Sequence, residues 1–297
     1  MDNIDGIMIS MIKEFDYKPL NDMLSNINSG KKLRSKLLLK IAKENEISFK
    51  LCAIIELIHA ASLLHDDVID ESHTRRGKAS INAIYGAKNA IMLGDILYSK
   101  GYFELSKFDS FISNSISNAV SLLSIGEMMD VSMSEEFNYN KEIYIKMIYY
   151  KTSVLIEATA KCGAFLANLN TQDFANYGKN LGIAFQIIDD ILDITQDSKT
   201  LGKPALNDFK EGKTTLPYIY LYEKLDKEDK KYLVSLFKKD LNTKEQDWIK
   251  SNLNKFNIIE KCITEAKEYG NDAINSVKKY NLTDLEDMVK SMIDRTF

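Results

Sequence analysis

The scarcity of helix-breaking residues constrains the fold of this chain more than any other feature. Its 297 residues include only 3 prolines and 13 glycines, the two residue types that most disfavour a helix interior. Apolar residues recur at spacings of three and four, the period of a helix with one buried face, in the runs 33–44, 49–71, 88–107, 110–132, 141–168 and 172–197. Shorter runs follow at 214–224, 227–239, 243–254, 257–279 and 283–296. The pattern predicts an all-α fold built from long helices.

Composition and charge narrow the class of protein. Hydrophobic residues make up 45% of the chain, enough for one large core, and we expect a single domain over residues 1–297. A net charge of -4 and a pI near 5.6 argue against a nucleic-acid partner. The three cysteines, Cys52, Cys162 and Cys262, predict reduced buried thiols. Because there is no cationic leader and no apolar run of about 18 residues, we expect a cytoplasmic protein without a transmembrane anchor.

One acidic pattern occurs twice. The sequence reads Asp-Asp-Val-Ile-Asp at 66–70 and Asp-Asp-Ile-Leu-Asp at 189–193, each directly or closely preceded by an apolar run. Residues four apart lie on one face of a helix, roughly 6 Å apart along its axis. Like charges at this spacing repel each other, and their apolar flanks suggest an interior-facing setting. We therefore expect a cation to compensate them.

Magnesium fits these carboxylates. It prefers oxygen ligands and commonly takes one or two protein carboxylates together with substrate phosphates. A solvated helix face would account for one such motif equally well. Two motifs, each after an apolar run, favour a site that holds a diphosphate through bridging metal ions.

Basic residues follow the first motif and recur elsewhere in the chain. Arg75 and Arg76 come shortly after Asp70, and guanidinium groups bind phosphate through paired hydrogen bonds. Further candidate anion ligands are Lys31, Lys32, Arg34, Lys151, Thr152, Lys203 and Lys213. His59 lies two helical turns before Asp66 on the same face. It is open to two interpretations, a buried core histidine or a donor to a diphosphate.

These residues together resemble a known family. The segments 30–34, 59–70, 75–77, 151–152, 185–193, 202–204 and 211–217 are similar, in order, to the blocks of the trans-isoprenyl diphosphate synthases, also called polyprenyl synthetases, and in particular to long-chain, octaprenyl-type members. Ser29 and Ser35 stand where the family usually has glycine and proline, and Lys32 stands where it has arginine. The likeness spans roughly residues 25–225.

The resemblance implies a fold, a reaction and a set of roles. The fold is an isoprenoid-synthase bundle of long helices around a central cavity, as a homodimer, with three Mg²⁺ ions per site. By resemblance, the metal ligands are Asp66, Asp70 and Asp189, supported by Asp67, Asp190 and Asp193; the allylic diphosphate ligands are Arg75, Lys151, Thr152, Gln186 and Lys203, with Lys151 also catalytic; and the isopentenyl diphosphate ligands are Lys31, Arg34, His59 and Arg76. The reaction joins the two diphosphates head to tail and releases pyrophosphate.

Product length depends on the residues that precede the first motif. The growing chain must run beside the helix that carries Asp66, so residues about one turn earlier limit it. These are Ala61 and Ser62, with Leu57 deeper, and the small side chains favour a medium or long all-trans product, octaprenyl for a quinone side chain, from a farnesyl or geranylgeranyl primer. Such a product is insoluble in water, so transient membrane contact during release is expected.

Other functions remain to be compared with this one. Bulky residues on neighbouring helices would instead give a short-chain farnesyl or geranylgeranyl diphosphate synthase. A class I terpene cyclase is disfavoured because Asp189, Asp193 and Asp197 lack the Ser and Glu of its second metal site. A non-catalytic partner subunit of a heteromeric synthase would lose aspartate motifs. A calcium module is disfavoured because the spacing is helical and lacks a glycine-turned loop.

Overall fold

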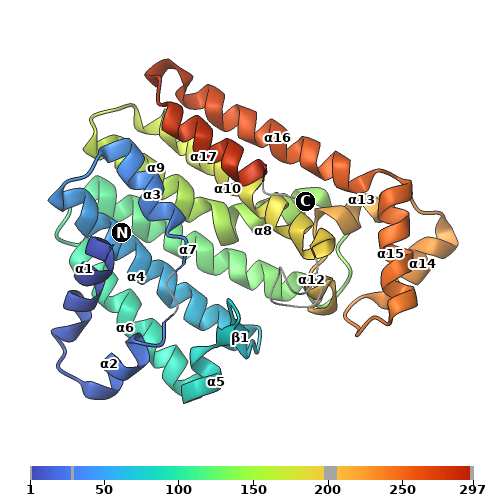
Figure 1. Cartoon of the computed structure of the whole chain (residues 1–297), viewed down its shortest axis with the longest axis horizontal. Coiled ribbons are helices and arrows are strands. Elements are labelled where there is room, and N and C mark those ends of the chain that lie inside the picture. Colours follow the sequence, from blue (N-terminus) through green and yellow to red (C-terminus); the bar gives the residue numbers. More distant parts are fainter. Residues whose placement is uncertain (1, 28–29, 197–205, 295–297) are drawn as a thin grey trace. The chain divides into compact units, whose positions relative to one another are not determined.

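The computed structural model describes residues 2–27, 30–196 and 206–294 of the chain (Figure 1). Nearly all elements are helices, which confirms the predicted all-α class. The chain forms two compact units. Unit 1 comprises Met1–Val120 and Ala158–Ala175, and unit 2 comprises Ser121–Glu157 and Asn176–Phe297. The single domain over 1–297 stays a prediction.

Unit 1 is organised around helix α4. Its elements are α1 (Asp2–Lys13), α2 (Lys18–Leu24), α3 (Leu33–Ala42), α4 (Glu46–Ile69), β1 (Thr74–Arg75), β2 (Lys78–Ala79), α5 (Ile81–Tyr85) and α6 (Ala87–Leu105). Helices α1, α3 and α6 all pack against α4. Asn45 caps α4, because its side chain accepts a hydrogen bond from the Ser48 amide while Ser48 Oγ accepts one from the Asn45 amide, both at 2.9 Å. The apolar residues that follow are buried almost without interruption, so α4 forms the core of the unit.

Three helices have residues in both units. They are α7 (Ser110–Met133), α9 (Val154–Leu166) and α10 (Thr171–Thr195). The run 141–168, predicted as one helix, begins with α8 (Lys141–Ile148) and continues through a five-residue π-helical segment, η1 (Tyr149–Ser153), into α9. The run is therefore helical from Lys141 to Leu166, with a π-helical segment at its centre that the periodicity did not predict.

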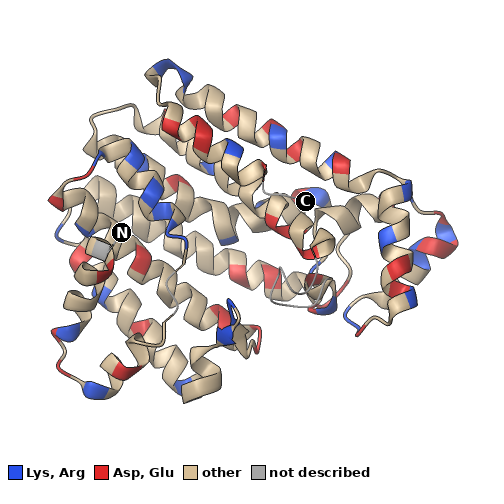
Figure 2. Cartoon of the chain, viewed as in Figure 1, with Lys and Arg blue, Asp and Glu red and all other residues tan. Residues whose placement is uncertain are grey.

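The remaining elements of unit 2 are shorter amphipathic helices. They are α12 (Asn207–Lys210), α13 (Leu216–Lys224), α14 (Lys227–Leu236), α15 (Thr243–Lys255), α16 (Ile258–Val277), the 3₁₀ turn η2 (Lys278–Tyr280) and α17 (Thr283–Ile293). Helix α16 packs against α13, α15 and α17. Figure 2 shows Lys and Arg interspersed with Asp and Glu along α14 and α15, the charge pattern expected of solvated helix faces.

A buried ion cluster stabilises unit 1. Glu104 and Lys100 are 3% and 4% exposed, and the Lys100 amino group lies 2.9 Å from Glu104 and 2.5 Å from Glu14. Lys107 and Lys50 also pair with Glu104, at 2.8 and 3.3 Å. Burial opposes the charge of Glu104, but these three lysines outweigh it and lower the pKa of Glu104 to about 2.

Cysteines and apolar helices agree with the sequence expectations. Cys52, Cys162 and Cys262 are free thiols and are buried, as predicted. Within the described part of the chain, α4 alone is long and apolar enough to cross a membrane by length and composition, and 61% of its most apolar window is buried inside the protein. A buried core helix passes the same test, so this feature is weak evidence for a membrane span.

Candidate active site

The first aspartate motif lies at the C-terminal end of α4. Asp66 is half-buried and Asp70, the C-cap residue, is exposed, whereas Asp67 is only 3% exposed. The buried carboxylate has a cationic partner. Arg75 donates from Nε and Nη2 to Oδ1 of Asp67, at 2.8 and 2.7 Å. The motif therefore contains one buried carboxylate, paired with Arg75, and two more exposed carboxylates.

A tight hairpin presents the two arginines. Strands β1 and β2 pair antiparallel, with Thr74 opposite Ala79 and Arg75 opposite Lys78. Arg76 and Gly77 form the two-residue turn and both have positive φ, 54° and 73°, as a type I′ hairpin turn requires. Arg75 lies in the first strand of this hairpin and its side chain contacts Asp67. Arg76 lies in the turn, and the sequence pattern did not predict this turn.

Arg34, His59 and Arg76 form a cationic cradle in unit 1. Burial, followed by the charges of Arg34, Arg76 and Arg75, lowers the pKa of His59 well below its ordinary value, so His59 is neutral at pH 7. Burial also lowers the pKa of Arg34 to about 10, opposed by Glu56. The buried atoms Arg34 Nε and His59 Nδ1 have no hydrogen-bond partner among the residues that the structure describes. Lys31 is exposed nearby in sequence. The cradle can therefore accept an anion.

The three residues predicted to control product length are buried on α4. Ala61, Ser62 and Leu57 are 0%, 4% and 1% exposed, and Ser62 Oγ donates to the His59 carbonyl oxygen at 2.9 Å. They lie in the helix that carries the first motif, as the spacing predicts. Their side chains belong to the interior of unit 1 and not to its solvent-exposed surface.

Lys151 lies in the π-helical segment η1, where it contacts two acids of α7. Its amino group is 2.6 Å from Asp130 Oδ2 and 2.8 Å from Glu127 Oε2. Burial lowers the pKa of Lys151, but the charges of Asp130 and Glu127 outweigh burial and raise it. Gly126 permits this approach, since a Cβ there would lie 2.2 Å from the Lys151 amide nitrogen. The lysine is therefore charged and held in place.

A hydrogen-bond network links η1 to the second aspartate motif in unit 2. Thr152 donates to Gln186 Oε1 at 2.7 Å, and Gln186 Nε2 donates to Asp190 Oδ1 at 2.8 Å. Tyr144 donates to Asp190 Oδ2 at 2.6 Å. Burial raises the pKa of Asp190 well above its ordinary value. The network fixes the orientations of the Thr152 and Gln186 side chains.

The other two aspartates of the second motif differ in burial. Asp189 is exposed, whereas Asp193 is 2% exposed and its Oδ2 accepts the backbone amide of Asp208 at 3.1 Å. Asp193 therefore contacts the start of α12. The second motif therefore combines exposed and buried carboxylates, as the first motif does.

The chain matches the family described as polyprenyl synthetase over residues 17–254. The chain therefore belongs to the polyprenyl synthetase family. Over 199 residues it is 37% identical to an octaprenyl diphosphate synthase of Escherichia coli (strain K12), a stretch that covers 64% of this chain and 62% of that protein. The match thus spans less than two thirds of this relative's length.

Solved structures of polyprenyl synthetases share the fold over nearly the whole chain. The crystal structure of octaprenyl pyrophosphate synthase from Helicobacter pylori has a TM-score of 0.93 and 46% identity, and covers 98% of this chain and 97% of that chain. The crystal structure of geranylgeranyl pyrophosphate synthetase from Pyrococcus horikoshii Ot3 has a TM-score of 0.91 and 30% identity, covering 99% and 96%. The predicted family is confirmed.

Four contact residues were not predicted from the sequence of this polyprenyl synthetase. Tyr144, Glu127, Asp130 and Glu56 contact or polarise the predicted ligands. The sequence offered a local sign of this role only for Glu127 and Asp130, because these acidic residues directly follow a mostly apolar run that ends at Gly126.

The remaining predicted ligand, Lys203, lies outside the described residues. Within residues 2–27, 30–196 and 206–294, no three His, Cys, Asp or Glu side chains gather closely enough to hold a metal ion.

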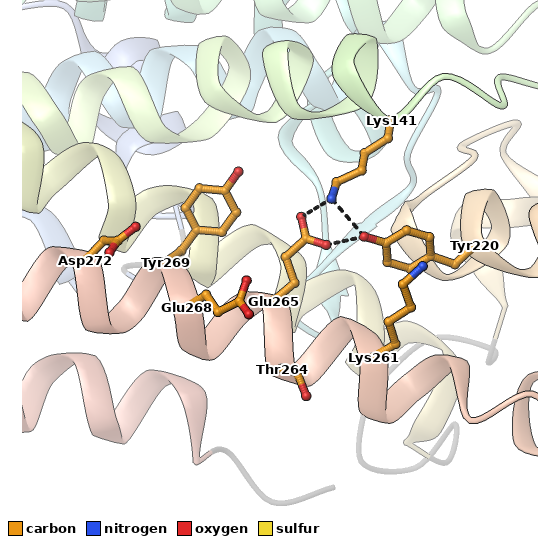
Figure 3. A pocket seen from close by; sticks show the side chains of 8 residues that line it. All are labelled: Lys141, Tyr220, Lys261, Thr264, Glu265, Glu268, Tyr269 and Asp272. Carbon is orange, nitrogen blue, oxygen red and sulfur yellow. Dashed lines mark hydrogen bonds and ion pairs between the residues drawn. The ribbon is translucent and has the colours of Figure 1, made fainter.

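A surface pocket of about 630 Å³ lies between α8, α13 and α16 of unit 2 (Figure 3). Lys141 is 2.8 Å from both Glu265 and the Tyr220 hydroxyl, and Tyr220 donates to Glu265. The Lys261 amino group lies 3.2 Å from the centroid of the Tyr220 ring. Because these charged groups are already paired with one another, we interpret the cluster as a structural tie among the three helices.

Proposed function

We propose that this chain condenses isopentenyl diphosphate with an allylic diphosphate, farnesyl or geranylgeranyl, to make a medium- or long-chain all-trans polyprenyl diphosphate. Pyrophosphate is the second product. The proposal fits the family and the octaprenyl diphosphate synthases among its relatives. Octaprenyl diphosphate for a quinone side chain is the specific product that we propose.

The burial of the six motif aspartates is the observation that carries the proposal. Asp66, Asp70 and Asp189 are half-buried or exposed, as ligands for a hydrated divalent ion need to be. Asp67, Asp190 and Asp193 are buried, and each contacts a neighbouring group. This division separates three candidate magnesium ligands from three residues that would support them structurally. Because no three such side chains among the described residues gather closely enough to hold a metal ion by themselves, the ions would be held jointly with the diphosphate oxygens of the substrate. Three Mg²⁺ ions per site are part of the proposal.

Two sets of anion ligands take part in the proposed reaction. Arg34, His59 and Arg76, with Lys31, bind the diphosphate of isopentenyl diphosphate. Lys151, Thr152 and Gln186, with Arg75 and Lys203, bind the allylic diphosphate. When bound at Asp66, Asp70 and Asp189, Mg²⁺ acts as a Lewis acid on the diphosphate oxygens.

The protein groups then favour departure of pyrophosphate. Charged Lys151 and Arg75 stabilise negative charge that develops on the leaving diphosphate as the allylic C–O bond breaks. The alkene of isopentenyl diphosphate forms the new C–C bond to the allylic carbon. The departed pyrophosphate takes the proton that is lost when the new double bond forms.

A condensation assay tests the proposed reaction. Purified protein is incubated with labelled isopentenyl diphosphate, farnesyl diphosphate and Mg²⁺, with an EDTA control, and products are separated by length. Metal-dependent products of about eight isoprene units are expected, from the small residues that precede Asp66. Products of three or four units would instead support the short-chain alternative. A folded protein that makes no product would support the non-catalytic subunit.

Product length has its own test at Ala61. Its side chain is fully buried on α4, so tyrosine there should obstruct a growing chain that runs beside this helix. Ala61→Tyr is expected to shorten the products while condensation continues, and Ser10→Tyr on α1 serves as a bulk control. Unchanged product length with Ala61→Tyr would contradict the proposed path.

Assembly and location complete the proposal. Ile125, Met128 and Val131 lie three residues apart on one face of α7 and are 45%, 72% and 45% exposed. An exposed apolar stripe of this kind supports the proposed homodimer. Chromatography with light scattering tests the dimer, and Met128→Lys should shift it toward the monomer.

We propose a cytoplasmic enzyme that contacts a membrane transiently when it releases its insoluble product.

A further inference from the structure

The loop that precedes α3 is tied to α1 by a buried ion pair. The Lys32 amino group contacts the Asp5 carboxylate, and the Lys32 side chain is buried whereas Asp5 is 40% exposed. Lys32 is the N-cap residue of α3 and has a left-handed backbone, φ 48° and ψ 48°. That conformation is unfavourable for a non-glycine residue, and a buried amino group needs a partner. Asp5 supplies that partner.

Lys32 lies between two residues that shape the cationic cradle. Two positions earlier, Gly30 lies against Arg76, because a Cβ on Gly30 would be 2.5 Å from Arg76 Nη2. Two positions later, Arg34 has its buried Nε without a hydrogen-bond partner within the described chain. A shift of the Lys32 backbone would therefore move both the surface behind Arg76 and the Arg34 side chain.

A second anchor holds the first turn of α3, directly after this loop. Ser35 donates to Glu56 Oε1 on α4 at 2.6 Å, and both residues are buried. The Cys52 thiol lies 3.6 Å from the Ser35 carbonyl oxygen. Because Ser35 is already fixed to α4, the ion pair with α1 determines the position of the preceding residues, 30–34.

The charges of the cradle give this ion pair a further effect. Arg34, Arg75 and Arg76 all lie close enough to His59 to act on it electrostatically. A fourth cation released into this region would compete for the same anion or repel the arginines. Asp5 neutralises the Lys32 amino group and keeps it on α1.

We propose that Asp5 is a positioning residue for isopentenyl diphosphate: by holding Lys32 it fixes residues 30–34 so that Arg34 and Arg76 bind one diphosphate. The proposal rests on the function proposed above. It assigns to α1, a helix with no proposed ligand of its own, control over the affinity for one substrate and not for the other.

Asp5→Asn tests the role. We expect the KM for isopentenyl diphosphate to rise about five- to tenfold, since small displacements of binding groups cost this much or more. The kcat and the allylic KM should stay within about twofold. Calorimetric binding of isopentenyl diphosphate alone should weaken by the same factor as the KM rises. Asp5→Glu should restore most of the affinity.

Glu14→Gln is the matched control. It removes the ion pair of Glu14 with Lys100 at 2.5 Å. Among the described residues, the ion pairs of Lys100 are with Glu14 and Glu104 and do not involve residues 30–34. Its isopentenyl diphosphate affinity should equal that of the wild type. Thermal melting of both variants reports folding. If Asp5 acts through Lys32, Asp5→Asn added to Lys32→Met should change the affinity no further.

Three outcomes would overturn the inference. These are an unchanged affinity in Asp5→Asn, a raised affinity because the released lysine binds the anion, and an equal loss in Glu14→Gln. Failure of the proposed function gives a different result. In that case the wild type neither condenses the two substrates nor binds isopentenyl diphosphate, which rejects both proposals, whereas wild-type condensation with an unchanged Asp5→Asn rejects only the inference.

Discussion

The candidate anion ligands of the two units differ in how far they are bonded before any substrate arrives. In unit 1, Arg34 Nε and His59 Nδ1 are buried atoms without a hydrogen-bond partner in the described chain. In unit 2, Lys151 contacts two carboxylates, and Thr152 and Gln186 are bonded to each other. Through these two atoms, Arg34 and His59 can therefore gain bonds to an anion without breaking others, whereas Lys151, Thr152 and Gln186 are oriented in advance and must share their donors.

This difference separates two ways of preparing a diphosphate site. Leaving buried donors unbonded costs stability but makes them available to an incoming anion. Fixing donors through a network such as Tyr144–Asp190–Gln186 stabilises one geometry and makes binding depend on neighbours that do not touch the substrate. Mutations should therefore act directly in unit 1 and often indirectly in unit 2.

The largest effects are expected at the exposed aspartates. Asp66→Ala and Asp189→Ala should each lower kcat at least about 100-fold, or roughly 3 kcal/mol of transition-state stabilisation. The two substitutions should lower kcat to a similar extent, because Asp66 and Asp189 are both proposed metal ligands. Removal of Mg²⁺ with EDTA should abolish turnover, and added Mg²⁺ should restore it.

Asp190→Asn is the control for this pair of substitutions. Asn keeps an acceptor oxygen for Tyr144 or Gln186 and occupies a buried position, so its kcat should fall less than that of Asp189→Ala. Steady-state rates at saturating substrates decide the point. Wild-type turnover by Asp66→Ala would reject the metal assignment.

An intermediate effect is expected from Thr152→Val. The substitution keeps the shape of the side chain and removes the donor to Gln186. The allylic KM should rise about three- to tenfold while the KM for isopentenyl diphosphate stays constant. Thr264→Val, which loses a hydroxyl that donates to the Glu260 carbonyl of its own helix, should change neither constant. An equal rise in both KM values would remove the distinction between the units.

The smallest effect concerns stability and is confined to unit 1. The folded pKa of Glu104 is depressed from 4.5 to about 2, so its ionised form stabilises the folded protein above about pH 4.5 and this stabilisation is lost as pH falls toward 2. Glu104→Gln should lower the melting temperature at pH 7 and reduce its dependence on pH between 4.5 and 2. Wild-type and variant melting curves of identical pH dependence would contradict the assignment.

The sequence predicted the parts of the fold that depend on local periodicity. The helices containing residues 33–42, 46–69 and 171–195 agree with predicted runs to within a few residues, because their apolar residues are buried in the core. Helices α1 and α2 were not predicted. The π-helical segment at Lys151 was missed. Its backbone lies against Gly126, 25 residues earlier in the chain, and such a contact leaves no local signal in the sequence.

The site was predictable in its residues and less so in its contacts. The motifs identified the candidate ligands, but the bonds of Lys32 with Asp5 and of Tyr144 with Asp190 join residues 27 and 46 positions apart. Such pairs leave no periodic signal. The role of each contact as support for a ligand therefore required the structure.

A single crossed kinetic experiment most directly tests the division between the two units. Arg34→Gln and Lys151→Met are compared with the wild type, and KM is measured for each substrate in turn. Arg34→Gln should raise the KM for isopentenyl diphosphate by about tenfold or more and leave the allylic KM nearly constant, and Lys151→Met should do the reverse. Variants that both raise the same KM, or that change neither, would contradict the assignment of one diphosphate to each set of ligands.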